Sequence, residues 1–260
     1  MGHNQPSDFS DRLAIVTGAS AGIGLACARM LAEGGARLVV NARRAGRLDE
    51  LVEIDPERVR PVAGDASDAA VIAGMLDAAR SLGGREADLV IANAGRGLRG
   101  SPLDSEEAQW EEVLQINTLA AARLMRSAIA RMTEEIGEHH GPPQRPRDVV
   151  VLGSTVGRNL SPFSSFYGAA KAAVHMMAEA MRREAGPRGI RVTTIEPGVV
   201  ASEFQAVAGY DPKAFGEFMA SMAPVLTPED VARTILFACA QPAGMHINEI
   251  MLRPTRQAYP

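Results

Sequence analysis

A tyrosine, a lysine and a serine in the second half of the chain have the residue types and spacing for proton transfer. Tyr167 and Lys171 are four residues apart in a helical stretch, so their side chains share one face. An ammonium beside a phenol stabilises the phenolate and lowers a pKa that starts at ~10. Ser154 follows a short apolar strand, and its hydroxyl can hold a substrate oxygen beside the phenol. A Tyr–Lys pair alone is usually an exposed pair without a function, but the three residues together predict proton exchange with a carbonyl or alcohol oxygen.

A glycine-rich turn near the N-terminus provides a place for a phosphate. It follows an apolar run and opens a helical stretch, with the sequence Thr-Gly-Ala-Ser-Ala-Gly-Ile-Gly over residues 17–24. Glycines there let the backbone turn sharply and approach a pyrophosphate at the positive end of the helix. Glycine also marks any tight strand–helix turn, but the position after the first strand favours a dinucleotide site. The expected cofactor contacts in this turn are Gly18, Ser20, Gly22, Ile23 and Gly24.

The residues at the end of the second expected strand select the cofactor. An acidic residue there would hydrogen-bond a ribose 2′-hydroxyl and repel a 2′-phosphate. The chain instead has Arg43 and Arg44, which suit a phosphate through charge-assisted hydrogen bonds, although both can equally be solvated. With the glycine turn upstream, this pair favours NADP(H).

Short apolar runs alternate with longer amphipathic stretches along the chain. The expected strands are 13–16, 38–40, 59–63, 88–92, 149–152, 192–195 and 247–252. The expected helices are 22–33, 48–54, 69–82, 105–131, 167–185 and 228–240. Apolar strands that alternate with helices indicate a parallel sheet covered on both faces. With right-handed crossovers, the pattern predicts an α/β fold with a doubly wound, Rossmann-like parallel sheet of about seven strands.

No linker divides the chain, so we expect one domain over residues 11–260 after a flexible tail, 1–10, with a substrate lid around 202–225. The segment 137–147 is rich in Pro and His and is interpreted as a surface insertion. A metal site at His139 and His140 has no supporting Cys or carboxylate spacing, so a solvated loop is the simpler interpretation.

The composition excludes several classes of protein. With 27 Lys+Arg against 31 Asp+Glu the net charge is −4, which argues against binding to nucleic-acid phosphates. No apolar run approaches the ~20 residues that span a bilayer, and the polar N-terminus lacks the apolar core of a secretion signal. Cys27 and Cys239 have no metal-like spacing and are expected to be reduced. We therefore expect a cytoplasmic protein without nucleic-acid or membrane partners.

Together these motifs resemble the short-chain dehydrogenase/reductase family in its single-domain form. The matching residues are Thr17-Gly18-x-x-x-Gly22-x-Gly24, Asp65, Asn93-Ala94-Gly95, Asn117, Ser154, Tyr167-x-x-x-Lys171 and Pro197-Gly198. The resemblance implies a catalytic tetrad in which Tyr167 is the general acid/base and Ser154 orients the carbonyl. Lys171 would hold the nicotinamide ribose and lower the tyrosine pKa, and Asn117 would hold a water in a proton relay.

The resemblance also implies further cofactor contacts. Asp65 and Ala66 would meet the adenine, and the cofactor floor would be formed by Asn93, Ala94 and Gly95. The nicotinamide would be covered by Pro197, Gly198, Val200 and Ser202. Arg43 stands where NADP-preferring members have an arginine, whereas Ala21 stands where many of them have a further basic residue.

Lysine is rare in this chain, because only Lys171 and Lys213 are lysines and the other 25 basic residues are arginines. The resemblance places Lys171 between phenol and ribose, where a compact ammonium fits and the bulkier guanidinium fork does not. This explains a lysine at position 171. Lys213 has no partner that the sequence reveals.

The substrate is less determined than the reaction. The C-terminal motifs, among them Ser202-Glu203-Phe204, are similar to the 3-hydroxy acid and serine dehydrogenase branch. That branch often carries an Arg-Phe pair shortly afterwards, but residues 207–210 contain no cation for a carboxylate. Arg158 could supply one, although a solvated arginine is the simpler interpretation. Apolar residues that can line a pocket, or pack the lid against the body, are Phe204, Tyr210, Phe215, Phe218, Met219 and Met222.

The leading hypothesis is an NADP(H)-dependent carbonyl reductase or alcohol dehydrogenase, acting on a small aldehyde or ketone with an apolar portion. Alternatives are a 3-hydroxy acid or serine-type dehydrogenase, a non-catalytic NADP(H) sensor, and a nucleotide-sugar epimerase, which generally needs a longer C-terminal domain. The resemblance implies a homodimer or homotetramer through the long helices that hold Asn117 and Tyr167.

Overall fold

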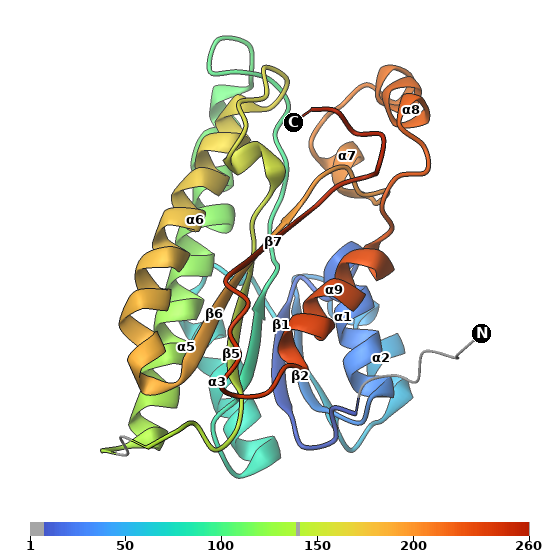
Figure 1. The fold of residues 1–260 in the computed structure, drawn as a ribbon. Coiled ribbons are helices and arrows are strands. Elements are labelled where there is room, and N and C mark those ends of the chain that lie inside the picture. Colours follow the sequence, from blue (N-terminus) through green and yellow to red (C-terminus); the bar gives the residue numbers. More distant parts are fainter. Residues whose placement is uncertain (1–7, 139–140, 260) are drawn as a thin grey trace, which may run out of the picture.

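Seven parallel strands form one sheet in the order β3-β2-β1-β4-β5-β6-β7 in the computed structural model, which describes residues 8–138 and 141–259 (Figure 1). The strands are β1 (Leu13–Thr17), β2 (Arg37–Ala42), β3 (Val59–Ala63), β4 (Leu89–Ala92), β5 (Arg147–Leu152), β6 (Ile190–Pro197) and β7 (Glu249–Leu252). The predicted doubly wound parallel sheet is confirmed. Because the strand order reverses between β1 and β4, a crevice is expected at the carboxyl ends of these two strands.

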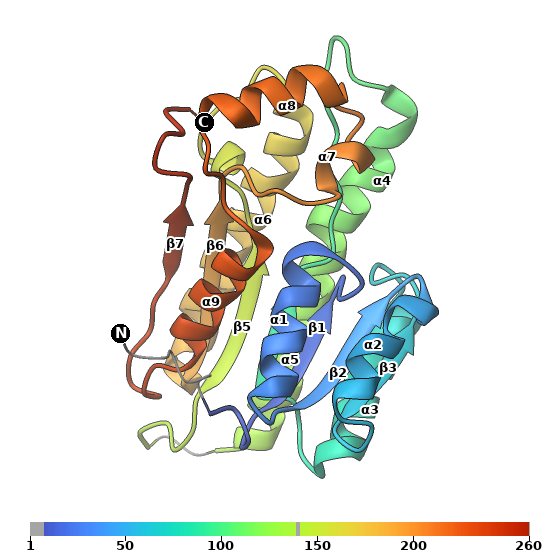
Figure 2. The same ribbon diagram turned by 90° about the vertical axis from the view of Figure 1, so that its right-hand side faces the viewer.

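Helices cover both faces of the sheet (Figures 1 and 2). One face is covered by α1 (Gly22–Glu33), α2 (Asp49–Ile54) and α9 (Pro228–Cys239). The other is covered by α3 (Ala69–Gly83), α5 (Ala121–Ile136) and α6 (Ser165–Ala185). Every residue of β1, β4 and β6 is buried, which is the burial expected for strands covered on both sides.

Local sequence signals explain where several helices begin and end. The Asp68 side chain accepts from the Ala70 amide at the start of α3, and Gly84 ends this helix in the left-handed conformation. Helix α9 begins with a capping box, in which Thr227 and Asp230 each bond the other's backbone amide. These local contacts fix the ends of elements whose packing is decided by the core.

The prediction of one helix over 105–131 is wrong in its bounds and its continuity. The segment begins with a 3-10 turn and α4 (Trp110–Leu114), passes through a π-helical stretch, Gln115–Ala120, and continues as α5. A π turn inserts an extra residue and re-aims the side chains on it, and such turns are frequent at functional sites. Here the π turn carries Asn117.

The ends of the expected domain differ in part from the prediction. Phe9 is buried and its amide donates to the Gly34 carbonyl at 2.9 Å, so the packed body begins before residue 11. Residues 1–7 of the expected tail lie outside the described residues, as do His139 and His140 of the expected insertion. The last residue of that insertion, Arg147, is the first residue of β5.

The segment 202–225, the predicted lid, contains two short helices, α7 (Phe204–Val207) and α8 (Pro212–Ser221), which lie above the carboxyl ends of the strands (Figure 2). In the described part of the chain, no helix combines the length and the apolar character that crossing a membrane requires.

Candidate active site

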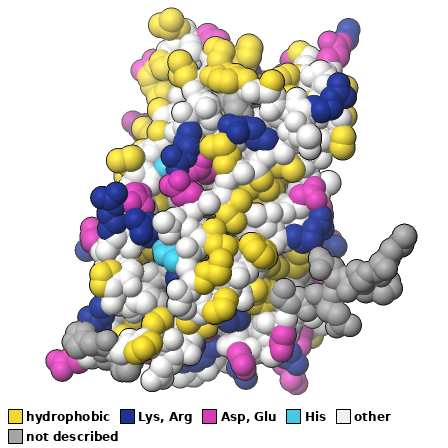
Figure 3. Space-filling view, in the orientation of Figure 1, with side chains coloured by type: hydrophobic (Ala, Val, Ile, Leu, Met, Phe, Trp, Pro, Cys, Tyr) yellow, Lys and Arg dark blue, Asp and Glu magenta, His cyan; other side chains and the backbone are white. Residues whose placement is uncertain are grey.

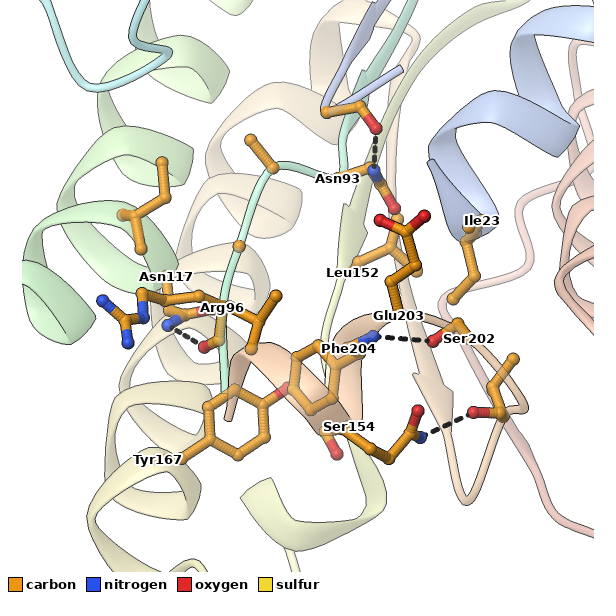
Figure 4. A pocket seen from close by; sticks show the side chains of 18 of the residues that line it. Ile23, Asn93, Arg96, Asn117, Leu152, Ser154, Tyr167, Ser202, Glu203 and Phe204 are labelled. Carbon is orange, nitrogen blue, oxygen red and sulfur yellow. Dashed lines mark hydrogen bonds between the residues drawn. The ribbon is translucent and has the colours of Figure 1, made fainter. Parts of the chain in front are cut away.

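A cavity of about 690 Å³ opens at the carboxyl ends of β1, β4, β5 and β6, beneath the lid. Its walls include nearly all residues that the sequence analysis singled out. They are Gly18, Ser20, Gly22, Ile23, Arg43, Arg44, Asp65, Ala66, Asn93, Ala94, Gly95, Asn117, Ser154, Tyr167, Lys171, Pro197, Gly198, Val200 and Ser202. Tertiary folding thus brings these distant motifs into one space (Figure 4).

Gly24 is the exception among the expected cofactor contacts. It is buried and is not among the residues that line the cavity, so its contact with a cofactor stays a prediction. A Cβ at this position would overlap the carbonyl oxygen of Gly18 and the amide of Asn93. Gly24 therefore lets α1 pack against the turn that precedes it. Gly18 and Gly22 differ from it, because their φ angles of 66° and 54° favour glycine on conformational grounds.

Tyr167, on α6, lies in the wall of the cavity next to Phe204. Its side chain is buried, and its ring meets the ring of Phe204 edge-on with the centroids 5.5 Å apart (Figure 4). Burial raises the pKa of Tyr167 above its usual value, and a hydrogen bond with the Ser154 hydroxyl only partly opposes this. The direction is opposite to the expected lowering by Lys171, because desolvation of the phenolate dominates in the protein without ligands.

Lys171 has a specific partner at the end of β5. Its ammonium donates to the Leu152 carbonyl at 2.6 Å and lies 5.7 Å from the centroid of the Tyr167 ring. Burial lowers the pKa of Lys171 to about 8, so the side chain remains largely protonated at neutral pH. The compact ammonium therefore fits a narrow space between the strand end and the phenol.

Asn117 presents an unpaired acceptor beside this lysine. Its amide nitrogen donates to the Arg96 carbonyl at 2.8 Å and to the Val113 carbonyl at 3.0 Å (Figure 4). Its Oδ1 is buried and has no hydrogen-bond partner among the described residues. A Cβ at Gly95 would lie 2.6 Å from this oxygen and 3.7 Å from the Lys171 ammonium, so the glycine leaves room for a polar group between them.

The cation pair at the end of β2 has a carboxylate neighbour that the sequence analysis missed. Arg43 and Arg44 are exposed, and the Arg43 guanidinium lies 3.8 Å from Glu112 of α4. Glu112 also pairs with Arg96. Because α4 lies about 70 residues further along the chain, no local sequence pattern could have revealed this contact. An anion bound at Arg43 would have to replace Glu112.

The lid contributes some of its expected residues to the cavity. Phe204, Tyr210, Phe215 and Phe218 line it, whereas Met219 and Met222 do not. Glu203 at the start of α7 pairs with Arg47, which follows β2, with oxygens 3.1 Å from the guanidinium. This ion pair joins the lid to the opposite rim of the cavity.

Arg158 is not a cavity residue in this structure. Its guanidinium binds the buried Glu196 at 2.7 Å and Glu249 at 2.5 Å. It is therefore not simply solvated, because the carboxylates of Glu196 on β6 and Glu249 on β7 hold it.

The cavity fits a nicotinamide dinucleotide in its chemistry. The glycine turn leaves the N-terminus of α1 open to an anion, and a second anion that replaced Glu112 could bind the arginines at the β2 end. The unpaired oxygen of Asn117 and the Lys171 ammonium lie beside Gly95, which lines the same cavity.

Comparisons with known proteins indicate one family. The family model for short chain dehydrogenases matches residues 12–212. Human dehydrogenase/reductase SDR family member 11 is 33% identical over 260 residues, which cover 96% of each chain. The closed form of a serine dehydrogenase complexed with NADP+ superposes with a TM-score of 0.84 at 27% identity, covering 95% of this chain and 96% of that one. An alcohol dehydrogenase from the archaeon Thermococcus sibiricus, complexed with 5-hydroxy-NADP, gives a TM-score of 0.78 at 25% identity, covering 95% and 97% of the two chains.

Proposed function

The chain belongs to the short-chain dehydrogenase/reductase family of oxidoreductases, and from this premise we propose that it is an NADP(H)-dependent enzyme that interconverts an alcohol and an aldehyde or ketone. The observation that carries the proposal is the meeting of Ser154, Tyr167 and Lys171 on one wall of a cavity that also contains the glycine turn. A protein that only sensed the cofactor would have no need for this set of groups.

The residues of the tetrad divide the proton chemistry between them. When bound, the cofactor would supply or accept the hydride at its nicotinamide ring. Tyr167 would give a proton to the carbonyl oxygen, and Ser154 would hold the same oxygen through its hydroxyl. The high pKa of Tyr167 keeps the phenol protonated without ligands, which is the form that carbonyl reduction requires. Asn117 and Lys171 would hold the water that returns a proton to the phenol.

The substrate side of the cavity supports a neutral carbonyl compound with an apolar portion. It is lined by Phe163, Phe215 and Phe218, together with the hydroxyls of two buried serines, Ser161 and Ser164. The similarity to serine dehydrogenase favours an amino or hydroxy acid as the second candidate. Against it, Arg158 is held by two carboxylates and Arg96 already binds Glu112 and Gln109. A carboxylate would therefore compete with existing partners at Arg158 and Arg96, and Lys171 is expected to hold the nicotinamide ribose.

Replacing the proposed acid tests the reaction. The variant Tyr167→Phe should lose at least ~10²-fold in kcat with NADPH and benzaldehyde or cyclohexanone, because it lacks the transferable proton. NADPH binding, followed by fluorescence titration, should remain largely intact. A variant with full activity would exclude Tyr167 as the acid. Serine and hydroxybutyrate with NADP+ in the same assays distinguish the second candidate, since a preference for them would contradict the neutral substrate.

The cofactor preference is tested at the end of β2. The variant Arg43→Ala should weaken NADPH binding about 10-fold or more and leave NADH binding unchanged, because it removes a charge-assisted hydrogen bond to the 2′-phosphate. Arg37→Ala, which removes an exposed arginine at the start of β2, is the matched control. A wild-type preference for NADH would overturn the choice of NADP(H).

We further propose a cytoplasmic homo-oligomer, a dimer or tetramer. Exposed apolar side chains support it on the long helices, at Leu119 and Met176, and on the face of α9 and β7, at Phe237 and Met251. Figure 3 shows hydrophobic side chains in a band over that second face. Light scattering coupled to gel filtration would test it, and a monomer at micromolar concentration would contradict it.

A further inference from the structure

One buried polar side chain of α6 has no role in the proposed tetrad. Tyr167, Lys171 and His175 follow one another at intervals of four residues, so they lie on one face of the helix. All three are buried. His175 does not line the cavity and so is not placed to touch a substrate.

Helix α6 binds the chain on both sides of Gly153. The Lys171 ammonium donates to the Leu152 carbonyl at 2.6 Å, and the Ser154 amide donates to Nε2 of His175 at 3.2 Å. The helix that carries Tyr167 is therefore tied directly to the backbone of the serine. Apart from its hydrogen bond with the Tyr167 phenol, the Ser154 hydroxyl makes two long bonds, 3.5 Å to the Pro197 carbonyl and 3.4 Å from the Val156 amide.

Two glycines make the space for this imidazole. A Cβ at Gly153 would overlap Nε2 of His175, and one at Gly157 would lie 2.5 Å from its Cε1. Neither glycine has a positive φ, so the backbone conformation would accept other residues at both positions. Room for the ring is the requirement that remains.

The electrostatic surroundings fix the form of the imidazole. Burial, with Lys171 and Arg158 nearby, lowers the pKa of His175 to about 4, so the ring is neutral at neutral pH. A neutral ring that accepts at Nε2 carries its proton on Nδ1. Nδ1 lies 3.8 Å from the carboxylate of Glu196, which is itself held by Arg158. The carboxylate thus favours the tautomer that the Ser154 amide needs.

We propose that His175 is a positioning residue, which sets the place of the Ser154 hydroxyl relative to the Tyr167 phenol by accepting the serine amide. This role rests on the proposed carbonyl chemistry at Ser154 and Tyr167. It adds to that chemistry a residue that touches neither substrate nor cofactor.

Three variants test the role with benzaldehyde and NADPH. His175→Leu removes the acceptor and should lower kcat about 10- to 100-fold, with little change in KM or in NADPH binding, because a small displacement of a reacting group costs this much. His175→Gln places an amide oxygen near the position of Nε2 and should restore most of kcat. The matched control is His246→Leu, because His246 is a partly buried histidine with one bond to the backbone, to the Val192 carbonyl of β6 at 3.0 Å, and it should keep normal kcat.

A fourth variant leaves the histidine in place. Gly157→Ala should displace the ring through its new methyl group and lower kcat in the same direction, and combined with His175→Leu it should add little further loss. It keeps the test open if His175→Leu fails to fold. In the wild type, imidazole nitrogen shifts measured by NMR at neutral pH should place the His175 proton on Nδ1.

Normal kcat in both His175→Leu and Gly157→Ala would overturn the role. So would an equal loss of kcat in His175→Gln and His175→Leu, or a loss of kcat in His246→Leu equal to that in His175→Leu. A proton on Nε2 of His175 in the wild type would also overturn it. The Tyr167→Phe variant separates this from failure of the proposed function. If Tyr167→Phe is inactive and the His175 variants are normal, only the positioning role fails.

Discussion

Two buried polar clusters, one at each end of the parallel sheet, differ in how completely their groups are paired. At the amino ends of β1, β5 and β6, Arg12 and Arg191 both bind Asp148, at 2.7 Å in each case. Arg12 also binds Asp88 at 2.8 Å and the Cys239 carbonyl at 3.1 Å. Each charge in this cluster has an opposite charge or several carbonyls around it.

At the carboxyl ends the buried groups are incompletely paired. Oδ1 of Asn117 and Nδ1 of His175 have no hydrogen-bond partner among the described residues, and Lys171 binds one carbonyl rather than a carboxylate. Such groups destabilise the fold, because the hydrogen bonds that they lose to water on burial are not replaced by bonds within the protein. The comparison shows that the cluster of Arg12, Asp88, Asp148 and Arg191 holds its charges for the fold, whereas Asn117 and Lys171 at the cavity keep polar atoms available to a ligand.

Removing a carboxylate from the fully paired cluster at the amino ends of the strands should have the largest effect on stability. Asp148→Asn removes the carboxylate shared by two buried arginines, so the free energy of unfolding should fall by about 5 kcal/mol. Urea denaturation measures this, and kcat of the folded fraction should stay near the wild-type value because the cavity lies at the other end. The matched control is Asp77→Asn, whose exposed ion pair with Arg131 should contribute less than ~1 kcal/mol. A stable Asp148→Asn protein would show that the cluster does not stabilise the fold.

Replacing the lysine at the carboxyl ends of the strands, Lys171, should affect activity more than stability. In Lys171→Arg the guanidinium cannot occupy the narrow space of the ammonium between Leu152 and Tyr167. We expect kcat/KM with NADPH and benzaldehyde to fall about 10³-fold, a loss of about 4 kcal/mol in transition-state stabilisation. Lys213→Arg in the lid is the matched control and should keep normal activity. Normal turnover in Lys171→Arg would refute the need for a compact cation.

The pH dependence of stability sharpens the comparison further. The pKa of His175 is about 4 in the folded chain and 6.5 when unfolded, so only the unfolded chain binds a proton between these values. The wild type should therefore lose up to about 3 kcal/mol as the pH falls from 6.5 to 4. His175→Gln should lack this part of the loss, which urea denaturation at several pH values would measure. Parallel curves for the two proteins would mean that the buried histidine does not destabilise the fold in acid.

The sequence predicted the elements and their order because hydrophobic periodicity is a local property. The bounds of α1 and β3 were predicted without error, and those of most other elements within three residues. The prediction failed at 105–131, where the π turn around Asn117 interrupts a pattern that remains helical in composition. A one-residue change of register is set by contacts with the loop after β4, such as the Asn117–Arg96 bond, and leaves no mark on the apolar pattern.

The candidate site was predictable where a residue type at a fixed spacing has one chemical use. Ser154, Tyr167 and Lys171 meet this condition, and the structure brings them to one cavity. Gly24 does not meet this condition, because a glycine that leaves space for a ligand and a glycine that lets a helix pack closely look alike in sequence. His175 carried a weak signal, since it continues the four-residue spacing of Tyr167 and Lys171 and has glycines at 153 and 157 nearby in the sequence.

By itself, the sequence determined the family, the order of the strands and the identity of the groups at the cavity, because these depend on residue type and local period. The tertiary structure alone decided the direction of the Tyr167 pKa, the partners of Arg158 and Arg43, and the contact between His175 and Ser154. Burial and ion pairing depend on contacts between segments that are distant in the sequence. Only the folded chain determines which of these segments meet.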